Sequence, residues 1–148
     1  MQIEYLLIKN FKSIKELEIK GIEDVLILVG RNNAGKSVVL DAIRAVTGDY
    51  EVTSRDFNNN EGNISIKVRI IIDERDLNIF FQKGLVSSFK HFDLWYKDFQ
   101  SKLPSYRDGR LDLEYVYSRD GRVKYRDGFK KNNSYIKSVL PKIFYVDH

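Results

Sequence analysis

The chain has 148 residues and a formal net charge of +4, and 43% of its residues are hydrophobic, 13% aromatic and 31% charged. This balance is typical of a folded domain, and the length suits one domain, or part of one, better than two. The absence of cysteine excludes disulfides, thiolate zinc sites and cysteine nucleophiles, and the two histidines, His91 and His148, cannot form a metal site alone.

The first elements that the sequence predicts are two strands joined by a turn. Residues 2–9 are mostly apolar, residues 10–13 form the turn, and Leu17 and Ile19 then alternate with charged residues, as in a half-exposed antiparallel strand. The chain enters this pattern without a secretory signal, with Glu4 inside it, and no apolar run approaches membrane-spanning length. We therefore expect a cytoplasmic protein that has no membrane partner.

A strand, a glycine-bounded loop and a helix follow in immediate succession. Residues 25–29 are all apolar, as expected for a strand covered on both faces. Residues 30–37 spell Gly-Arg-Asn-Asn-Ala-Gly-Lys-Ser, which fits the phosphate-loop pattern of glycine, four residues, glycine, lysine and serine or threonine. The helix is expected to start near Lys36 and to end at a cap formed by Gly48. Its apolar positions recur at helical spacing: Val39, Ala42, Ile43 and Val46.

This loop predicts a site for ATP and Mg²⁺. Gly30 and Gly35 allow the chain to turn so that the backbone N–H groups of residues 33–38 face one concavity. Lys36 would reach the β- and γ-phosphates, and the Ser37 hydroxyl would be a ligand of Mg²⁺. The positive end of the helix dipole would lie beside the phosphates.

Beyond this helix, the polar residues 54–63 predict a surface connection, and the alternation of residues 64–72 predicts a strand. Asp76 is predicted to cap a further helix, whose apolar stripe continues past Gly84. Lysines interleave with the aromatic part of this stripe, which suits a buried face, the interpretation we favour, or a surface that stacks bases or docks a partner helix. The stripe consists of Leu77, Phe80, Phe81, Leu85, Phe89, Phe92, Trp95, Tyr96 and Phe99.

The last predicted unit is a hairpin. Residues 111–117 alternate, Val123 and Tyr125 continue the period, and the Asp-Gly pair at residues 120–121 predicts the turn. Basic residues gather here and suit either solvated hairpin ends or an edge that contacts phosphates, which makes DNA a candidate partner. They are Arg107, Arg110, Arg119, Arg122, Lys124, Arg126, Lys130 and Lys131. Residues 142–148 predict a final apolar strand.

Two segments together resemble a known group of proteins. Residues 5–19 (YLLIKNFKSIKELEI) and 25–43 (VLILVGRNNAGKSVVLDAI) are similar to the amino-terminal signature of ABC-type ATPases of DNA metabolism. These include the SMC and RecF groups and, most closely, the OLD (overcoming lysogenization defect) family. The resemblance implies an α/β P-loop NTPase fold, with a mixed or antiparallel sheet around the phosphate-loop strand and helix. It also implies a role in DNA metabolism or phage defence, as a homodimer or with a partner ATPase segment.

The resemblance also assigns candidate site residues. Lys12 and Ser13 occupy positions where members of the group touch the nucleotide near its phosphates, and Ser37 carries over as the Mg²⁺ ligand. Arg31 stands where a proline is common, which should leave the backbone cradle unchanged. The candidate nucleotide-binding residues are Lys12, Ser13, Gly30, Asn32, Asn33, Ala34, Gly35, Lys36, Ser37 and Val38.

Other parts of an ABC-type head have no clear counterpart in the sequence. We find no Leu-Ser-Gly-Gly-like signature segment. Residues 70–74 end in Asp73-Glu74 and resemble a Walker B strand. However, they come earlier in the chain than the Walker B strand of the family does, and they lie on an alternating pattern typical of an antiparallel strand. Residues 146–148 are a second partial match, with the same objection. Two glutamines lie in helical patterns and do not suit a glutamine loop: Gln82 and Gln100.

The sequence therefore predicts that residues 1–148 form a single, partial ATPase domain, the amino-terminal lobe of an ABC-type head. We expect it to bind ATP and Mg²⁺ and to hydrolyse ATP little or not at all alone. One alternative is a complete small P-loop NTPase or kinase that uses Asp73 and Glu74. Another is a DNA- or protein-interaction module with a vestigial phosphate loop.

Overall fold

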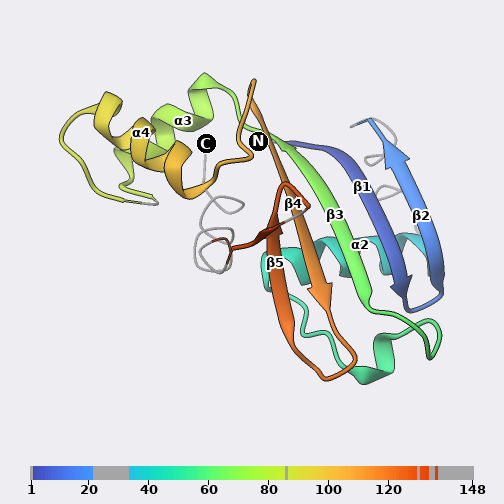
Figure 1. Cartoon of the computed structure of the whole chain (residues 1–148). Helices are drawn as coiled ribbons and strands as arrows, with labels where there is room; N and C mark the ends of the chain where they lie inside the picture. The colour runs from blue at the N-terminus through green and yellow to red at the C-terminus, as the bar shows by residue number, and fades with distance from the viewer. Residues whose placement is uncertain (1, 22–33, 86, 130, 134–135, 137–148) are drawn as a thin grey trace.

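The computed structural model describes residues 2–21, 34–85, 87–129, 131–133 and 136. Its strands are β1 (Gln2–Phe11), β2 (Ile14–Lys20), β3 (Ile64–Ile71), β4 (Arg110–Tyr117), β5 (Val123–Asp127) and β6 (Lys131–Asn132). They form one sheet in the order β2-β1-β3-β4-β5-β6, in which all neighbouring strands are antiparallel (Figure 1). The predicted α/β class is confirmed. The strands predicted at residues 25–29 and 142–148 lie outside the described residues.

The first hairpin is tighter than the sequence predicted. β1 continues through Asn10 to the buried Phe11, which pairs with Ile14, so the turn contains only Lys12 and Ser13. Asn10 and Lys12 both have positive φ angles, of 60° and 52°. Because Phe11 is fully buried, the strand has to extend two residues beyond the predicted boundary to place this ring in the core.

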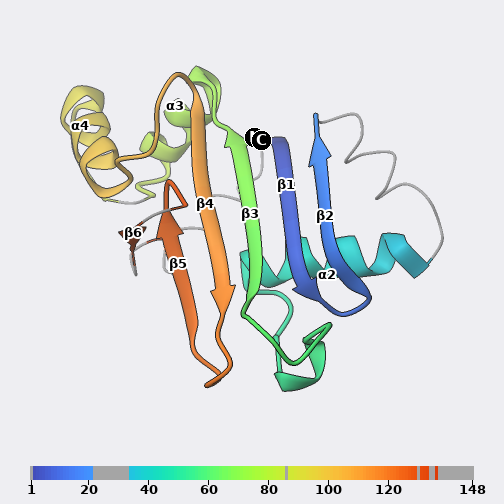
Figure 2. The ribbon, with the colours of Figure 1, turned by 45° about the vertical axis from the view of Figure 1, so that its right-hand side comes forward.

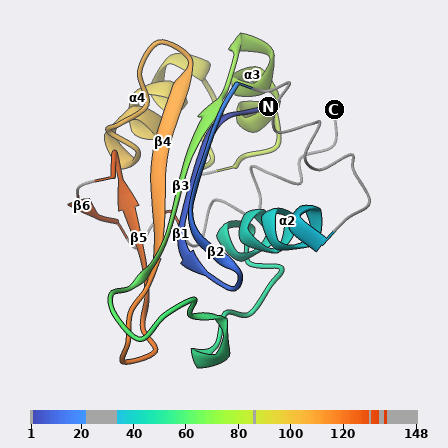
Figure 3. The same ribbon diagram turned by 90° about the vertical axis from the view of Figure 1, so that its right-hand side faces the viewer.

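One face of the sheet is apolar. Directly paired residues share a face, and one row across five strands consists of Leu17, Ile8, Ile66, Tyr115 and Tyr125. Helix α2 (Ala34–Thr47) crosses this face (Figures 2 and 3). The Tyr125 hydroxyl donates a hydrogen bond to the Val46 carbonyl oxygen at 2.7 Å, which joins β5 to the last turn of the helix.

The opposite face of the sheet carries mainly charged side chains. The next row consists of Glu18, Leu7, Lys67, Glu114 and Arg126. Beside it, Arg69 on β3 pairs with Asp112 on β4, with 2.7 Å between Nε and Oδ1 and 3.2 Å between Nη2 and Oδ2. The strict alternation predicted for residues 64–72 therefore divides an apolar from a charged face, as expected for a two-sided antiparallel sheet.

Helix α2 confirms the helix predicted after the phosphate loop but begins earlier, at Ala34. Val39, Ala42 and Val46 are buried against the sheet. The helix ends in the predicted glycine cap: Gly48 has φ of 89°, its N–H donates to the Ala45 carbonyl and the Asp49 N–H donates to the Arg44 carbonyl. This pair of bonds is a Schellman motif.

The predicted continuous aromatic helix is wrong. It is divided into α3 (Glu74–Gln82) and α4 (Phe92–Lys102), and Gly84 adopts a φ of 65° just beyond α3. The two helices pack together beyond the end of β3 (Figure 1) through the rings of Phe81, Phe92 and Trp95. Trp95 and Phe99 are fully buried, so the buried-face interpretation holds for the centre of the stripe, whereas Phe89 is exposed.

The predicted cap at Asp76 is also wrong. Asp73 is the N-cap of α3, because its Oδ1 accepts a hydrogen bond from the Asp76 N–H at 2.9 Å. Asp76 returns the bond by accepting from the Asp73 N–H at 3.1 Å. The two aspartates therefore form a reciprocal capping box, and the helix starts three residues earlier than predicted.

The predicted hairpin between β4 and β5 is confirmed. Its turn is closed by the Ser118 N–H donating to the Arg122 carbonyl and by Gly121, at φ of 84°. Between α2 and β3, residues 54–56 form a short 3-10 helix, η1 (Ser54–Asp56), in the region predicted to be a surface connection. Among the described residues, no helix is long and apolar enough to span a membrane.

Candidate functional site

The phosphate-loop residues fall on both sides of the boundary of the described part. Gly30, Asn32 and Asn33 lie outside it. The first turn of α2 contains the backbone of Ala34, Gly35 and Lys36. The side chain of Ser37 is exposed, and that of Val38 is half-buried. The Gly-Lys-Ser end of the pattern therefore coincides with the amino-terminal turn of a 14-residue helix.

This turn suits an anion. No acidic residue lies in the first turn of α2, and the unsatisfied N–H groups and the dipole of a helix favour negative charge at that end. The Ser37 side chain is exposed there and available as a ligand. The described residues fit the ATP and Mg²⁺ that the sequence predicts.

Lys12 lies beside the same helix. Its Nζ is 2.7 Å from Oδ2 of Asp41, which follows Ser37 by four residues and so lies on the same face of α2. Burial would lower the pKa of the Lys12 ammonium, but the hydrogen bond to Asp41, supported by Tyr50, outweighs this effect and raises the pKa. Lys12 therefore stays charged beside α2, the helix that opens with the last residues of the phosphate-loop pattern.

Three further contacts fix Lys12. Its ammonium lies 4.5 Å from the centre of the Tyr50 ring, its N–H donates to the Asp56 carbonyl at 2.6 Å, and its carbonyl accepts from the Asn58 side chain at 2.9 Å. The Tyr50 hydroxyl donates to Asp56 Oδ1 at 2.9 Å, which closes a ring of contacts through Lys12, Tyr50 and Asp56. These contacts hold together the turn between β1 and β2, the segment that follows α2, and η1.

Asn10 organises the loop that faces this turn. Its buried side-chain nitrogen donates to the carbonyls of Glu61 and Gly62, at 3.1 and 3.4 Å, and its oxygen accepts from the Asn59 N–H at 2.9 Å. The left-handed φ of Asn10 suits asparagine, which tolerates this region better than most residues. The Asn-Phe-Lys-Ser segment is therefore a structural link between α2 and residues 56–63. Ser13, a predicted site residue and the last residue of this segment, is exposed.

The acidic pair that resembles a Walker B motif lies elsewhere. Asp73 and Glu74 follow β3, which is antiparallel to both of its neighbours. In Figure 2, α3, which starts at Glu74, lies at the upper left of the sheet, whereas the first residues of α2 lie at its right-hand edge. The Asp73 carboxylate caps α3, and the hydrogen bond that it accepts from the Asp76 backbone lowers its pKa.

The remaining candidates for an ABC-type site do not gather near α2 in the described part of the chain. Gln82 ends α3 and Gln100 lies in α4, both in helices as predicted. Residues 146–148 are outside the described residues.

Several basic residues of the β4–β5 region have partners within the molecule. Arg110 pairs with Glu4 at 2.8 Å, Arg126 with Glu114 at 3.5 Å and Arg122 with Asp120 at 3.3 Å. Arg119 stacks on the ring of Phe57, with 3.7 Å between Cζ and the ring centre, and donates to the Asn59 carbonyl. These contacts favour the interpretation of solvated hairpin ends over a free phosphate-contacting edge.

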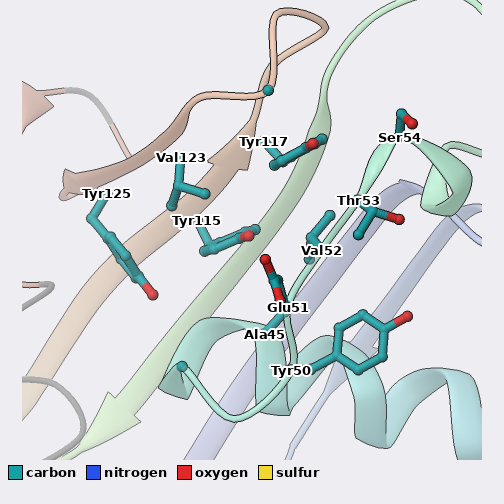
Figure 4. Close-up of a pocket in the computed structure, with 12 residues that line it drawn as sticks. Ala45, Tyr50, Glu51, Val52, Thr53, Ser54, Tyr115, Tyr117, Val123 and Tyr125 are labelled. Carbon is teal, nitrogen blue, oxygen red and sulfur yellow. The ribbon is translucent and has the colours of Figure 1, made fainter.

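A second feature is a tyrosine-lined pocket of about 560 Å³ at the carboxyl end of α2 (Figure 4). Tyr115 and Tyr125 form one wall, with ring centres 5.4 Å apart in an edge-to-face arrangement. Burial raises the pKa of Tyr125 to about 12, so its hydroxyl remains protonated and donates to Val46. The pocket is at the opposite end of α2 from the phosphate-loop residues.

Sequence reasoning missed Asp41, Tyr50 and Asn10. The spacing of Asp41 from Ser37 was a usable signal, because residues four apart share a helix face. Tyr50 and Asn10 gave no such signal, since their roles depend on how the turn after β1 meets the segment after α2.

Comparison with known proteins identifies the family. Residues 1–145 match the sequence model of a family described as the AAA ATPase domain. The uncharacterized protein MJECL10 of Methanocaldococcus jannaschii is 28% identical over 96 residues, which make up 65% of this chain and 36% of that protein. The chain thus spans about a third of the length of this curated relative.

Two solved SMC structures share the fold. The first comes from work on ATP-driven dimerization and DNA-stimulated activation of SMC ATPases. It has a TM-score of 0.60 and 18% sequence identity, and the matched region covers 97% of this chain and 80% of the SMC chain. The second is an SMC head bound to the C-winged helix domain of ScpA. It has a TM-score of 0.58 and 17% sequence identity, and the matched region covers 99% of this chain and 42% of the SMC chain. At these identities the likeness concerns the fold alone.

Proposed function

The chain belongs to the AAA ATPase domain family, and we propose that it is the nucleotide-binding lobe of an SMC-like ATPase head that binds ATP with Mg²⁺. In this proposal residues 1–148 form a single, partial domain, and a second copy or a partner ATPase segment completes the site. The OLD group, and with it a role in DNA metabolism or phage defence, is the more specific assignment that the Asn-Phe-Lys-Ser and phosphate-loop segments support.

One observation carries the proposal: the Gly-Lys-Ser end of the phosphate-loop pattern opens α2, whose first turn is free of acidic residues. Backbone N–H groups of this turn would bind the phosphates, Lys36 would neutralise the β- and γ-phosphates and Ser37 would hold the metal ion. Bound Mg²⁺ supplies neutralisation of the phosphate charge. The nucleotide-binding residues proposed are Lys12, Ser13, Gly30, Asn32, Asn33, Ala34, Gly35, Lys36, Ser37 and Val38.

The alternative of a complete kinase-like enzyme has less support. It needs Asp73 or Glu74 near the phosphates, whereas Asp73 caps α3 and shares its hydrogen bonds with Asp76. DNA remains a proposed partner, supported by the net charge of +4 and by exposed lysines such as Lys124. Such binding should weaken steeply as salt rises.

The test is the affinity of the full chain for a fluorescent ATP analogue in the presence of Mg²⁺. Loss of the charge-assisted contacts of one lysine should weaken binding about a hundredfold in Lys36→Ala. Lys97→Ala, which removes an exposed lysine from α4, is the matched control and should bind as the wild type does. Equal affinity of the Lys36→Ala and wild-type chains would refute the assignment.

A further inference from the structure

Lys12, Asp41 and Tyr50 form a cluster beside the phosphate-binding turn that no sequence pattern assigned as a unit. We propose that Asp41 and Tyr50 are positioning residues, which hold the Lys12 ammonium ready to bind a phosphate oxygen of the nucleotide. The inference rests on the proposed function, because it concerns how the same site recognises a triphosphate.

Asp41 is placed so that its partner Lys12 lies close to the start of α2. Asp41 is the fourth residue after Ser37, a rise of about 6 Å along one face of α2. The 2.7 Å ion pair therefore places the Lys12 ammonium against the residue that lies about one helical turn along α2 from Ser37. An ammonium has three N–H donors, and the bond to Asp41 uses one, so Lys12 can contact a phosphate oxygen without leaving Asp41.

Lys12 is held in place by its neighbours before any ligand binds. A lysine is normally a flexible cation that loses rotamer freedom when it binds a ligand. Here the backbone is held by bonds to Asp56 and Asn58, and the ammonium lies 4.5 Å from the Tyr50 ring centre. Figure 4 shows the Tyr50 ring turned away from the tyrosines of β4 and β5. Folding has therefore already ordered this cation.

The positive charge of Lys12 compensates the negative charge of Asp41. A carboxylate one turn from the phosphates would repel them if it stood alone. With Lys12 bound, the negative charge of Asp41 is compensated, and about a quarter of each side chain remains accessible to solvent: 27% for Lys12 and 22% for Asp41. The pair thus anchors the cation without adding net negative charge to the site.

A comparable ion pair on the other face of the sheet provides a control. Arg69 and Asp112 also lie 2.7 Å apart and are similarly exposed, at 37% and 26%. They belong to the charged face, whereas α2 crosses the apolar face (Figure 3). Loss of either ion pair should lower the stability of the fold. Only loss of the Lys12–Asp41 pair should also lower the affinity for the nucleotide.

The experiment is a double-mutant cycle on the full chain, with ATP·Mg²⁺ affinity measured by calorimetry. Asp41→Ala and Lys12→Ala should each weaken binding about tenfold, and the double variant should also lose about tenfold, because the two residues act as one unit. Asp41→Asn keeps a hydrogen-bond acceptor and should lose less than Asp41→Ala. Asp112→Ala should lower the melting temperature but leave the ATP affinity unchanged.

The outcomes separate this inference from the proposed function. If ATP binding depends on Lys36 while the losses from Lys12→Ala and Asp41→Ala multiply to about a hundredfold, positioning by Asp41 is refuted and the nucleotide site stands. Tighter binding by Asp41→Ala or Asp41→Asn would also refute it, because Asp41 would then compete with the phosphates. If Lys36→Ala binds ATP like the wild type, the proposed function itself fails.

Discussion

At the scale of single residues, Lys12 combines an unfavourable backbone with an ordered side chain. A φ of 52° costs a non-glycine residue about 1–2 kcal/mol, and the hydrogen bonds to Asp56 and Asn58 hold the backbone there. This strain lies at the turn that places the Lys12 ammonium against Asp41 of α2. The turn is therefore less stable than an unstrained turn would be, and its geometry fixes the position of one cation.

The strain predicts an inverted ranking of two substitutions. Both Lys12→Gly and Lys12→Ala lose the ion pair with Asp41, but only glycine relieves the left-handed φ, so Lys12→Gly should be about 1 kcal/mol more stable than Lys12→Ala. At Lys124, in an extended strand, alanine should be more stable than glycine by about 0.5–1 kcal/mol. Urea denaturation measures both differences. The same ranking at both positions would show that Lys12 is unstrained.

Asp73 gives a second prediction at this scale, which depends on pH. Loss of the cap in Asp73→Ala should cost about 1 kcal/mol at pH 7, whereas Asp73→Asn should retain most of it because asparagine also caps helices. The folded-state pKa of Asp73 is lowered, so the contribution of its charge is present above the pKa of an unfolded aspartate, about 4, and is lost as pH falls through the folded-state value.

Urea denaturation at pH 7 and at pH 3 tests this prediction. The difference between wild type and Asp73→Ala should shrink at the lower pH. A difference that stays constant, or grows, on acidification would show that the carboxylate charge does not stabilise α3.

At the scale of elements, the paired helices α3 and α4 form an aromatic unit away from α2. Trp95 is the single tryptophan of the chain, is fully buried and donates from Nε1 to the Leu85 carbonyl at 2.8 Å. Its ring stacks on that of Phe99, with centres 5.2 Å apart. Trp95 fluorescence therefore reports on the packing of this unit.

We expect Phe99→Ala to lower the free energy of unfolding by about 3–5 kcal/mol, because it leaves a cavity beside Trp95. Leu94→Ala on the same helix is the control: its side chain is 54% exposed, and the change should stay within about 0.5 kcal/mol. Urea unfolding followed by Trp95 fluorescence compares them. A similar small loss for both variants would mean that the aromatic unit is not a packed core.

The same elements show what the sequence could predict. The alternation of β3 and the glycine cap of α2 depend on local rules and were correct. The break between α3 and α4 was missed because the aromatic residues on either side keep a helical spacing, while Gly84 and the unpatterned residues before His91 end the first helix. The cap of α3 was misplaced by three residues although Asp73 and Asp76 carry the spacing of a capping box.

The site was predictable to a different extent. The phosphate loop is a contiguous pattern, and the helix that the sequence predicts after it is confirmed by α2, whose first turn contains residues 34–37 of the pattern. The cluster around Lys12 is not contiguous: it joins residues 12, 41, 50 and 56 through contacts that exist only after β1, α2 and η1 have packed. Local patterns cannot specify such contacts.

At the scale of the whole molecule, the fold resembles part of a larger head. The chain covers 42% of one SMC head structure and 36% of its archaeal relative. We therefore expect the isolated chain to bind ATP normally but to hydrolyse it near the background rate, because the signature segment and the acidic residues would come from elsewhere. Phosphate release under saturating ATP measures this. Magnesium-dependent turnover that Glu74→Gln abolishes would instead favour the complete-enzyme alternative.

A crystal structure of the full chain with a non-hydrolysable ATP analogue and Mg²⁺ would show directly where the nucleotide binds. We expect the phosphates at the amino-terminal turn of α2, with the Ser37 hydroxyl on the metal ion and the Lys12 ammonium on a phosphate oxygen while still bonded to Asp41. Nucleotide bound in the tyrosine-lined pocket at the other end of α2, or phosphates remote from Lys36 and Ser37, would contradict it.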